Sequence, residues 1–317
     1  MIDNPTLIFD LDEETFSHFP YFEGIIPQGY WGNWLGVLTR ANVWAFSKEV
    51  MDIYNSTRRE RFEYPLNDEH ILDWYSLLLS VIQAKGKFTV AAIGCGWGRW
   101  LSAGAFAAKY SKKDFFLIGV EAEPEHFEWL QIHLKENNIT ADKYRLIHAA
   151  AADYCGNCWF YVGKPASWYG QSMVPDANVI SLLKESVKIG STMPYNNETI
   201  QRMTCVDLKE VVNNQDLINY MMLDIQGSEE LFLTKYPEIL QKTVKMINVG
   251  THSPDIEKNL RKFFFCLGWT CIFNIPMNSV VQFNIRKKKS ESNSENKKIV
   301  KFGDGVQIWS NNLLSDS

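Results

Sequence analysis

The sequence has few of the features that mark secreted, membrane-spanning or nucleic-acid-binding chains. Its 317 residues include six cysteines, too few for the disulfide framework of a secreted scaffold. No apolar run approaches the roughly 18 residues of a membrane span, and the acidic start, MIDNPTLIFDLDEE, is unlike a signal peptide. The net charge of −5 gives no general attraction for nucleic acid. We therefore expect a cytoplasmic protein with reduced thiols, no membrane span and no nucleic-acid partner.

The one closely spaced cysteine pair, Cys155 and Cys158, is weak evidence for a zinc site. Such a site needs a second pair, or histidines at zinc-finger spacing, beside the first. Gly156 and Asn157 between the cysteines are typical of a two-residue hairpin turn. We expect the cysteines to flank a turn, and we assign no metal ligands from spacing.

Strand and helix patterns alternate through most of the chain. Apolar runs at 88–93, 115–121, 144–152, 219–225 and 244–250 predict five buried strands, and helical patterns lie between several of them. A helix is predicted over 68–84, with Asp68 as its N-cap and Gly86 as its stop. Such alternation indicates an α/β fold in which helices cover both faces of a mostly parallel sheet. Three later strand-like segments, WTCIFNIP, VVQFNIR and GVQIW, have no helices between them and predict an antiparallel C-terminal edge.

Two regions lie outside this alternation. Residues 1–65 are irregular and rich in aromatic side chains, and we expect an N-terminal extension or cap before a single domain at 66–317. The charged, low-complexity stretch 287–298 cannot bury apolar surface, so we expect a mobile loop there.

A glycine-rich turn follows the first buried strand. Gly94, Gly96 and Gly98 allow a sharp turn and leave room for a ligand, and amides at the start of the following helix can bind a polar group. Glu121 ends the next strand, where a carboxylate suits the two hydroxyls of a ribose. Open α/β sheets bind ligands at the carboxyl ends of their strands, so we expect a nucleoside-containing cofactor at this edge.

The glycine spacing favours S-adenosylmethionine over a dinucleotide. The dinucleotide pattern G-x-G-x-x-G would place its third glycine at position 99, which is Arg99. S-adenosylmethionine has no pyrophosphate that requires that spacing, and the antiparallel tail after five parallel strands also favours a methyltransferase. The alternatives are a nucleotide-sugar or NAD-dependent enzyme on a similar sheet, and a non-catalytic cofactor-binding module.

Longer motifs add a family resemblance. GVEAEPEHFEWL, CVDLKEVV, LDIQGSEELFL and INVGTHSPDIEKNLRKFF follow one another as in the FkbM family of S-adenosylmethionine-dependent methyltransferases, which the chain resembles over 66–310. The chain departs from the family at Leu223, where lysine is common, and at Gln226, where glutamate is common. The resemblance implies a seven-stranded class I methyltransferase fold, S-adenosyl-L-homocysteine as a product, and a hydroxyl acceptor, often on a sugar, glycolipid or secondary metabolite.

The predicted cofactor residues follow the carboxyl edge of the sheet. Glu121 is expected to bind the ribose, and small residues after the third strand leave room for adenine, although the same alanines also suit a helix or core. Arg99 could pair with the cofactor carboxylate or lie in solvent. The full predicted cofactor set is Gly94, Gly96, Gly98, Arg99, Glu121, Ala122, Ala149, Ala150 and Asp224.

Asp224 and His252 are the predicted catalytic residues, because they end the fourth and fifth strands beside the expected methyl group. A histidine can accept the proton that an acceptor hydroxyl must lose, or it can simply bond the backbone of its loop. A divalent metal between the two residues is an alternative that no ligand spacing supports.

The acceptor is expected to be a small molecule or glycan. Trp168 and Tyr169 could stack on a sugar face and Gln171 could bond a hydroxyl, while Glu69 and His70 are weaker candidates. The alternative for the two aromatic residues is packing within their loop. The sequence leaves open the acceptor, the methylated atom, metal dependence and the oligomeric state.

Overall fold

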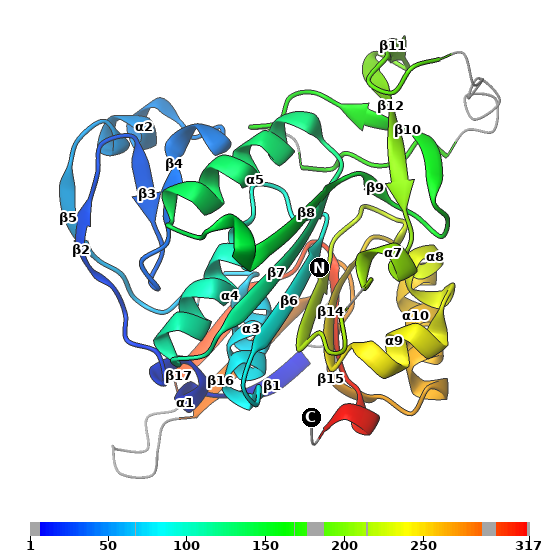
Figure 1. The fold of residues 1–317 in the computed structure, drawn as a ribbon. Coiled ribbons are helices and arrows are strands. Elements are labelled where there is room, and N and C mark those ends of the chain that lie inside the picture. The colour runs from blue at the N-terminus through cyan, green and yellow to red at the C-terminus, as the bar shows by residue number, and fades with distance from the viewer. Residues whose placement is uncertain are drawn as a thin grey trace, which may run out of the picture.

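A mixed seven-stranded sheet forms the centre of the protein. The computed structural model describes residues 7–66, 68–167, 169–175, 187–213, 215–286 and 296–315. The strands of the main sheet are β6 (Phe88–Ile93), β7 (Phe115–Glu121), β8 (Tyr144–His148), β13 (Tyr220–Leu223), β14 (Met246–Thr251), β15 (Thr270–Ile275) and β18 (Gly305–Ser310). Their spatial order is β15-β18-β14-β13-β6-β7-β8 (Figure 1). All run parallel to one another except β18, which is antiparallel to both of its neighbours.

This strand order confirms the predicted fold class, a class I methyltransferase sheet with an antiparallel C-terminal edge. The chain builds β6, β7 and β8 outward to one side, then crosses over and builds β13 and β14 on the other side of β6. The order therefore reverses between β6 and β13. In open α/β sheets, ligands bind outside the carboxyl ends of the strands at such a reversal.

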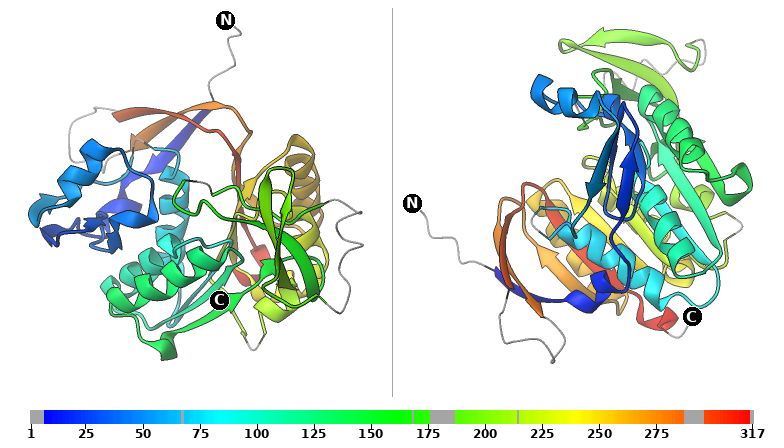
Figure 2. Two further views of the ribbon diagram at one scale, coloured as in Figure 1. Left: turned by 90° about the horizontal axis from the view of Figure 1, so that it is seen from above. Right: turned by 90° about the vertical axis from the view of Figure 1, so that its left-hand side faces the viewer.

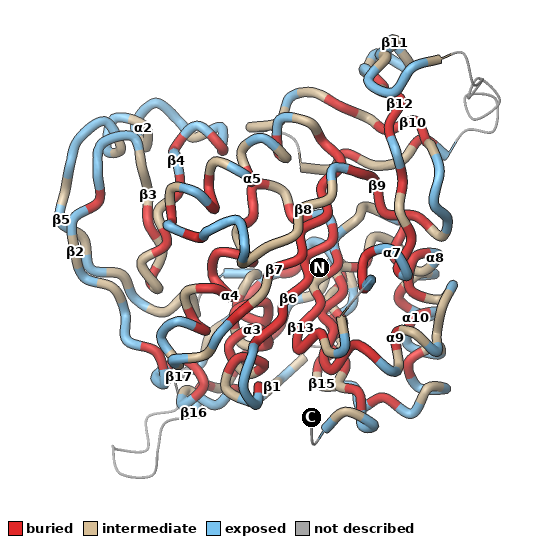
Figure 3. The backbone as a smooth tube through the Cα atoms, viewed as in Figure 1, coloured by how far each residue is buried: buried red, intermediate tan, exposed pale blue. Residues whose placement is uncertain are grey.

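Helices cover both faces of the sheet. One face carries α3 (Ile71–Gln83), α4 (Arg99–Tyr110) and α5 (Pro124–Glu136). The other carries α7 (Leu208–Val211), α8 (Glu229–Thr234), α9 (Pro237–Thr243) and α10 (Pro254–Cys266). Successive residues of β6 enter opposite cores: Val90 and Ala92 join the first, Ala91 and Ile93 the second. Buried residues accordingly run through the middle of the molecule (Figure 3).

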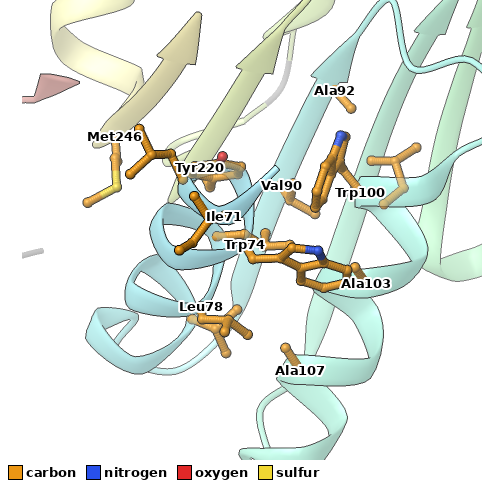
Figure 4. Close-up of a cluster of buried hydrophobic side chains, with 14 of the residues drawn as sticks. Ile71, Trp74, Leu78, Val90, Ala92, Trp100, Ala103, Ala107, Tyr220 and Met246 are labelled. Atoms are coloured by element: carbon orange, nitrogen blue, oxygen red, sulfur yellow. The ribbon is translucent and has the colours of Figure 1, made fainter. Parts of the chain in front are cut away.

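The core between α3, α4 and the sheet combines large and small side chains (Figure 4). Trp74 meets Trp100 edge to face, with ring centroids 5.0 Å apart, while Ala103 and Ala107 let α4 approach. Burying each large apolar side chain is worth about 1.5–3 kcal/mol. The predicted N-cap is corrected: α3 begins at Ile71 after His70, and the Asp68 carboxylate accepts from the His70 amide at 3.0 Å.

A second sheet lies beside the main one. It consists of β9 (Ala150–Ala151), β10 (Gly156–Val162), β11 (Thr192–Tyr195) and β12 (Glu198–Val206). The single strand predicted over 144–152 is thus two: β8 joins the main sheet and β9 pairs with β12. The predicted Gly-Asn hairpin turn is wrong, because Gly156 and Asn157 begin β10 and pair with β12. Cross-strand pairing here overrides local turn propensity.

A third sheet joins distant parts of the sequence. It contains β1 (Leu7–Asp12), β16 (Val280–Arg286) and β17 (Asn296–Lys301). Figure 2 shows β1 in blue against the orange β16. VVQFNIR was expected at the edge of the main sheet but forms β16 here. Of the loop predicted at 287–298, residues 287–295 lie outside the described residues and 296–298 belong to β17, which corrects that end of the prediction.

Residues 23–61 form a small lobe to one side of α5 (Figure 1). Its elements are β2 (Glu23–Ile26), β3 (Tyr30–Gly32), β4 (Leu38–Arg40), α2 (Lys48–Tyr54) and β5 (Arg58–Arg61), and α1 (Glu13–Ser17) precedes it. The remaining short helices are η1 (Ala41–Val43), η2 (Ala141–Lys143) and η3 (Asn312–Leu314). The lobe is fixed to α5 because the Asn137 side chain bonds both the amide and the carbonyl of Leu38, and Arg40 pairs with Glu136.

Two global features agree with the sequence. All six cysteines are free thiols. In the parts of the chain that the structure describes, every helix is too short or too polar to span a bilayer.

Candidate active site

A cavity opens at the strand-order reversal, beyond the ends of β6, β7 and β13. It encloses about 610 Å³ of empty space, part of it open to solvent. Among the predicted cofactor residues, those that line it are Gly94, Gly96, Glu121, Ala122, Ala149 and Asp224. We call it the cofactor cavity.

The three glycines of the turn have different reasons for lacking a side chain. Gly94 has φ +72°, and a Cβ there would lie 1.9 Å from the carbonyl oxygen of Asp224, so the two strand ends can approach only with glycine. Gly98 has φ +85°, and its Cβ would meet Leu130 of α5 at 2.4 Å. A Cβ at Gly96 would have Tyr169 Cε1 as its nearest neighbour, at 3.6 Å, so it would meet no collision. The space left open beside Gly96 belongs to the cavity. Two of the glycines therefore serve packing and one leaves room for a ligand.

Glu121 holds the glycine turn in place. Its Oε2 accepts from the Gly96 amide at 2.6 Å, and its Oε1 accepts from the amides of Ala122 and Glu123 at 3.0 and 2.8 Å. Burial raises the pKa of this carboxyl, while nearby His126 and the amide bonds act in the opposite direction. Oε1 thus already accepts two bonds and Oε2 one, which leaves a further acceptor site on Oε2, and Glu121 faces the cavity.

Three predicted cofactor residues do not line this cavity. Gly98 packs against α5, and Ala150 is buried in β9. Arg99 lies near Asp68, Glu69 and Asp73 at the start of α3, and burial lowers the pKa of its guanidinium while these acids act to raise it. Three protein carboxylates therefore interact with its charge, and the pairing of Arg99 with a cofactor carboxylate stays a prediction.

Tyr169 and Gln171, predicted to bind the acceptor, line the cofactor cavity instead. The Tyr169 ring stacks between His126, at a centroid distance of 4.5 Å, and Trp44 of the 23–61 lobe, at 4.9 Å. Its hydroxyl donates to the Val43 carbonyl. The lobe thereby braces the loop that closes one side of the cavity. Trp168 lies outside the described residues.

Sequence reasoning missed several residues that line the cavity, among them Phe160, Met173 and His126. Phe160 and Met173 come from the second sheet and the loop beside it, and an isolated β-bridge joins them. His126 lies in the first turn of α5, where its Nε2 contacts the Pro165 carbonyl at 2.9 Å. No local pattern marks these residues, because tertiary folding alone brings the second sheet to the main one.

The turn after β13 exposes Asp224 at the edge of the cavity. Gln226 has φ +53° and Gly227 φ +104°, which reverses the chain into α8. Gln226 Nε2 donates to Asp224 Oδ1 at 3.0 Å, a bond that a glutamate at this position could not donate. Leu223, the other departure from the FkbM pattern, is fully buried in the sheet.

His252 lies between two carboxylates. Its Nδ1 is 2.7 Å from Oε1 of the fully buried Glu229, and its Nε2 is 3.3 Å from Oδ1 of the half-exposed Asp224. Glu229 also accepts from the amides of Ile225 and Gly227. Burial disfavours the charged ring, but the bonds to Asp224 and Glu229 outweigh it and raise the pKa of His252 to about 10. In the free protein at neutral pH, the His252 ring is therefore protonated on both nitrogens and positively charged.

A second cavity, of about 530 Å³, adjoins the first at Asp224. Glu69 and His70 line it, as do Asp73, His252 and Asp304. The weaker acceptor candidates from the sequence thus lie beside the predicted catalytic pair. We call it the acceptor cavity.

Metal binding gains no geometric support. Among the described residues, no group of three or more histidine, cysteine, aspartate or glutamate side chains is arranged to hold a metal ion. The Asp224–His252–Glu229 contact is a hydrogen-bonded set in which both histidine nitrogens already have carboxylate partners.

Comparisons with known proteins identify the family. A protein of Jannaschia sp. (strain CCS1), named as a methyltransferase, is 31% identical over 223 residues, which cover 69% of this chain and 76% of that protein. No protein-family model matches the chain.

Three of the solved structures with a similar arrangement are the following. FkbM from Methylobacillus flagellatus KT is 10% identical, with a TM-score of 0.40 over 77% of this chain and 56% of its own. Precorrin-6y C5,15-methyltransferase from Geobacter metallireducens GS-15 is 11% identical, with a TM-score of 0.36 over 73% and 83%. The N-terminal domain of human METTL16 in complex with SAH is 11% identical, with a TM-score of 0.34 over 76% and 68%. Scores and identities this low carry no argument about this chain.

The family assignment therefore depends on the Jannaschia sequence, whose identity extends over most of both chains. The sheet order and the cavity at the strand-order reversal agree with it. The chain belongs to the methyltransferases.

Proposed function

We propose that this protein is an S-adenosylmethionine-dependent O-methyltransferase of the FkbM type, acting on a hydroxyl of a sugar or related small molecule. The observation that carries the proposal is that two cavities meet at Asp224, one with a nucleoside-compatible lining and one with a polar lining. A methyl group has to pass between a donor site and an acceptor site, and this arrangement provides both.

The cofactor cavity has the features that S-adenosylmethionine requires. Gly96 leaves space at the turn, and the Glu121 carboxylate faces that space with acceptor capacity for ribose hydroxyls. Ala149 and Ala151 are small, and Phe160 offers a ring beside them, which suits a flat base. Asp224 would hold the ammonium group of the methionine portion.

S-adenosylmethionine, when bound, supplies a methyl group on a positively charged sulfur that a nucleophile can displace. The chain's own task is to orient the acceptor hydroxyl and to remove its proton. His252 Nε2 is the candidate base, and Glu229 fixes the ring through Nδ1.

His252 can act as a base only after losing the proton that it holds in the free protein. That proton is stabilised by the negative charges of Asp224 and Glu229. A cation that neutralises Asp224 lowers the pKa of His252, since an opposite charge is removed from its surroundings. Binding of a cationic ligand at Asp224 and loss of the His252 proton would then be linked.

Calorimetric titration tests the cofactor assignment. We expect S-adenosylhomocysteine to bind one-to-one with a micromolar or lower dissociation constant, and NAD not to bind. The reverse preference would favour a dinucleotide enzyme on the same sheet.

A transfer assay with labelled S-adenosylmethionine and a panel of sugars and polyols tests the chemistry. His252→Ala should lower the rate about 10²–10⁴-fold while the S-adenosylhomocysteine dissociation constant stays unchanged. His18→Ala, an exposed histidine in the N-terminal part of the chain, is the control. Full activity of His252→Ala in the presence of chelator would exclude both the histidine and a metal. Binding without transfer to any acceptor would favour a non-catalytic module.

A further inference from the structure

The acceptor cavity is strongly acidic. Carboxylates reach it from three parts of the fold: Glu69 and Asp73 at the start of α3, Asp224 after β13, and Asp304 before β18. Among the described residues that line it, none is a lysine or an arginine. The basic side chains among these lining residues are His70 and His252, so the charge of the four carboxylates is only partly offset within the described wall.

We propose that the acceptor carries an ammonium group close to the hydroxyl that is methylated, so that the substrate class is an aminated polyol such as an amino sugar. The inference rests on the proposed function, because it assigns this cavity to the acceptor of methyl transfer. It adds a charge requirement that neither the fold nor the relatives provide.

The acceptor cavity has more carboxylates than the ammonium group of the cofactor could contact. Among the described carboxylates, Asp224 borders both cavities, whereas Glu69, Asp73 and Asp304 line the acceptor cavity alone. Asp73 is partly satisfied, with Oδ2 3.0 Å from His70 Nδ1 and Oδ1 accepting from Asn248 Nδ2 at 2.8 Å. Glu69 and Asp304 are exposed to solvent. These two carboxylates are available to a ligand.

Other charges near the cavity do not remove this imbalance. The charge of Arg99 interacts with Asp68, Glu69 and Asp73, but Arg99 does not line the cavity. His252 is shared between Asp224 and Glu229, so this set of three retains a net negative charge when the ring is protonated. A phosphorylated or carboxylated acceptor would be repelled by this wall.

The rest of the lining suits a polyol. Asn248 lies at the buried end of the cavity, where its amide bonds Asp73 and the Tyr220 hydroxyl. Apolar surface comes from Met222, Phe302 and Val306. Sites that bind small molecules combine apolar walls with a few fixed polar groups.

A bare metal ion fits this cavity less well than an organic cation. The described residues provide no group of three or more ligating side chains in metal geometry. An ammonium group needs only hydrogen-bond acceptors, and carboxylates from separate elements can supply them.

A positive charge on the acceptor also affects how readily His252 loses its proton. The groups in contact with His252 are Asp224, which follows β13, and Glu229 of α8. Asn248 of β14, the strand that His252 follows, and Asp304 line the same cavity. An ammonium group among these acids offsets part of their field and favours loss of the His252 proton. We expect binding of the cationic acceptor to release a proton to the buffer.

The test uses the full chain saturated with S-adenosylhomocysteine, once binding of that ligand has been established. The probes are 2-amino-2-deoxyglucose, its N-acetyl derivative, glucose and glucose 6-phosphate, titrated calorimetrically. The amino sugar should bind at least about tenfold more tightly than the neutral sugars, as a charge-assisted hydrogen bond allows, and the phosphate should not bind. The affinity of the amino sugar should fall with added salt.

Matched variants locate the effect. Asp304→Asn and Glu69→Gln should each reduce the preference for the amino sugar about three- to tenfold and leave S-adenosylhomocysteine affinity unchanged. Asp52→Asn makes the same change on the exposed surface of α2 and should alter neither quantity.

Several outcomes would overturn the proposal. These are equal affinity for charged and neutral sugars, no binding of the amino sugar, or a preference that survives both cavity variants. Binding of Mg²⁺ alone that is lost in Asp304→Asn would assign the cavity to a metal. Failure of S-adenosylhomocysteine itself to bind would contradict the proposed function and is seen before any acceptor is added.

Discussion

Glu229→Gln tests how the buried carboxylate controls His252. Glu229 Oε1 contacts His252 Nδ1 at 2.7 Å, and both of its oxygens accept from the Gly227 amide at 3.1 Å. A glutamine keeps one acceptor oxygen but turns an NH₂ group toward one of these donors. The substitution therefore removes a charge-assisted bond to the histidine while nearly preserving side-chain volume.

The size of the effect follows from that bond. A hydrogen bond to a charged group contributes about 1.5–3 kcal/mol, and one pKa unit corresponds to about 1.4 kcal/mol. The pKa of His252 should therefore fall from about 10 by roughly one to two units. The bond to Asp224 remains and continues to favour the charged ring.

NMR titration of the imidazole resonances measures this shift directly. In the wild type, kcat/KM should rise with pH until His252 is deprotonated, and in Glu229→Gln this limb should move to lower pH. Glu230→Gln is the control, because Glu230 is the next residue of α8 and its carboxylate bonds Asn259 instead. An unchanged His252 pKa in a folded Glu229→Gln protein would refute the reasoning.

Three further predictions concern the glycine turn and buried groups. Gly94→Ala should destabilise the fold by at least about 1–3 kcal/mol in denaturant unfolding and weaken S-adenosylhomocysteine binding, because its Cβ would collide with the Asp224 carbonyl. Gly29→Ala, with a similar φ of +82° and no atom within 4 Å, isolates the backbone strain, and equal losses in the two variants would discount the collision. Glu121→Gln should weaken S-adenosylhomocysteine binding by about 1–3 kcal/mol, since charge-assisted bonds are lost, and an unchanged dissociation constant would remove this residue from the site. Burial lowers the pKa of His133 to about 4, below its unfolded value, so the stability it contributes should be lost as pH falls from about 6.5 toward 4, and a His133→Gln variant with the same pH dependence would contradict this.

The pH dependence of stability should also report His252, with the opposite sign. Its folded-state pKa of about 10 lies above the unfolded value near 6.5. Its contribution to the free energy of unfolding is therefore complete below about pH 6.5 and is lost as pH rises toward 10. Denaturant unfolding of wild type and His252→Ala across pH 6–10 should converge at the alkaline end, and parallel curves would contradict the raised pKa.

The central sheet could be predicted because its strands are continuous apolar runs. The segment FTVAAI at 88–93 is one such run, and the structure buries all of its residues in β6. The meeting of Asp224 and His252 was also predictable, since both follow adjacent parallel strands whose carboxyl ends share one edge.

The surroundings of the site could not be predicted in the same way. Tyr169 lines the cofactor cavity because Trp44 and Val43, more than a hundred residues earlier, fix its ring. Arg99 does not line the cofactor cavity, and its charge interacts with acids at the start of α3. Glu229 lies in the first turn of α8, where an acid is favourable in any case, and only the structure brings its carboxylate to His252. Contacts between distant segments leave no local pattern.

A crystal structure of the protein with S-adenosylhomocysteine tests the central claim most directly. The account predicts the ribose hydroxyls on the Glu121 carboxylate, the adenine beside Ala149 and Phe160, and the sulfur facing Asp224 at the junction of the two cavities. Density for the ligand elsewhere, or a reversed orientation that turns the sulfur away from Asp224 and His252, would contradict it.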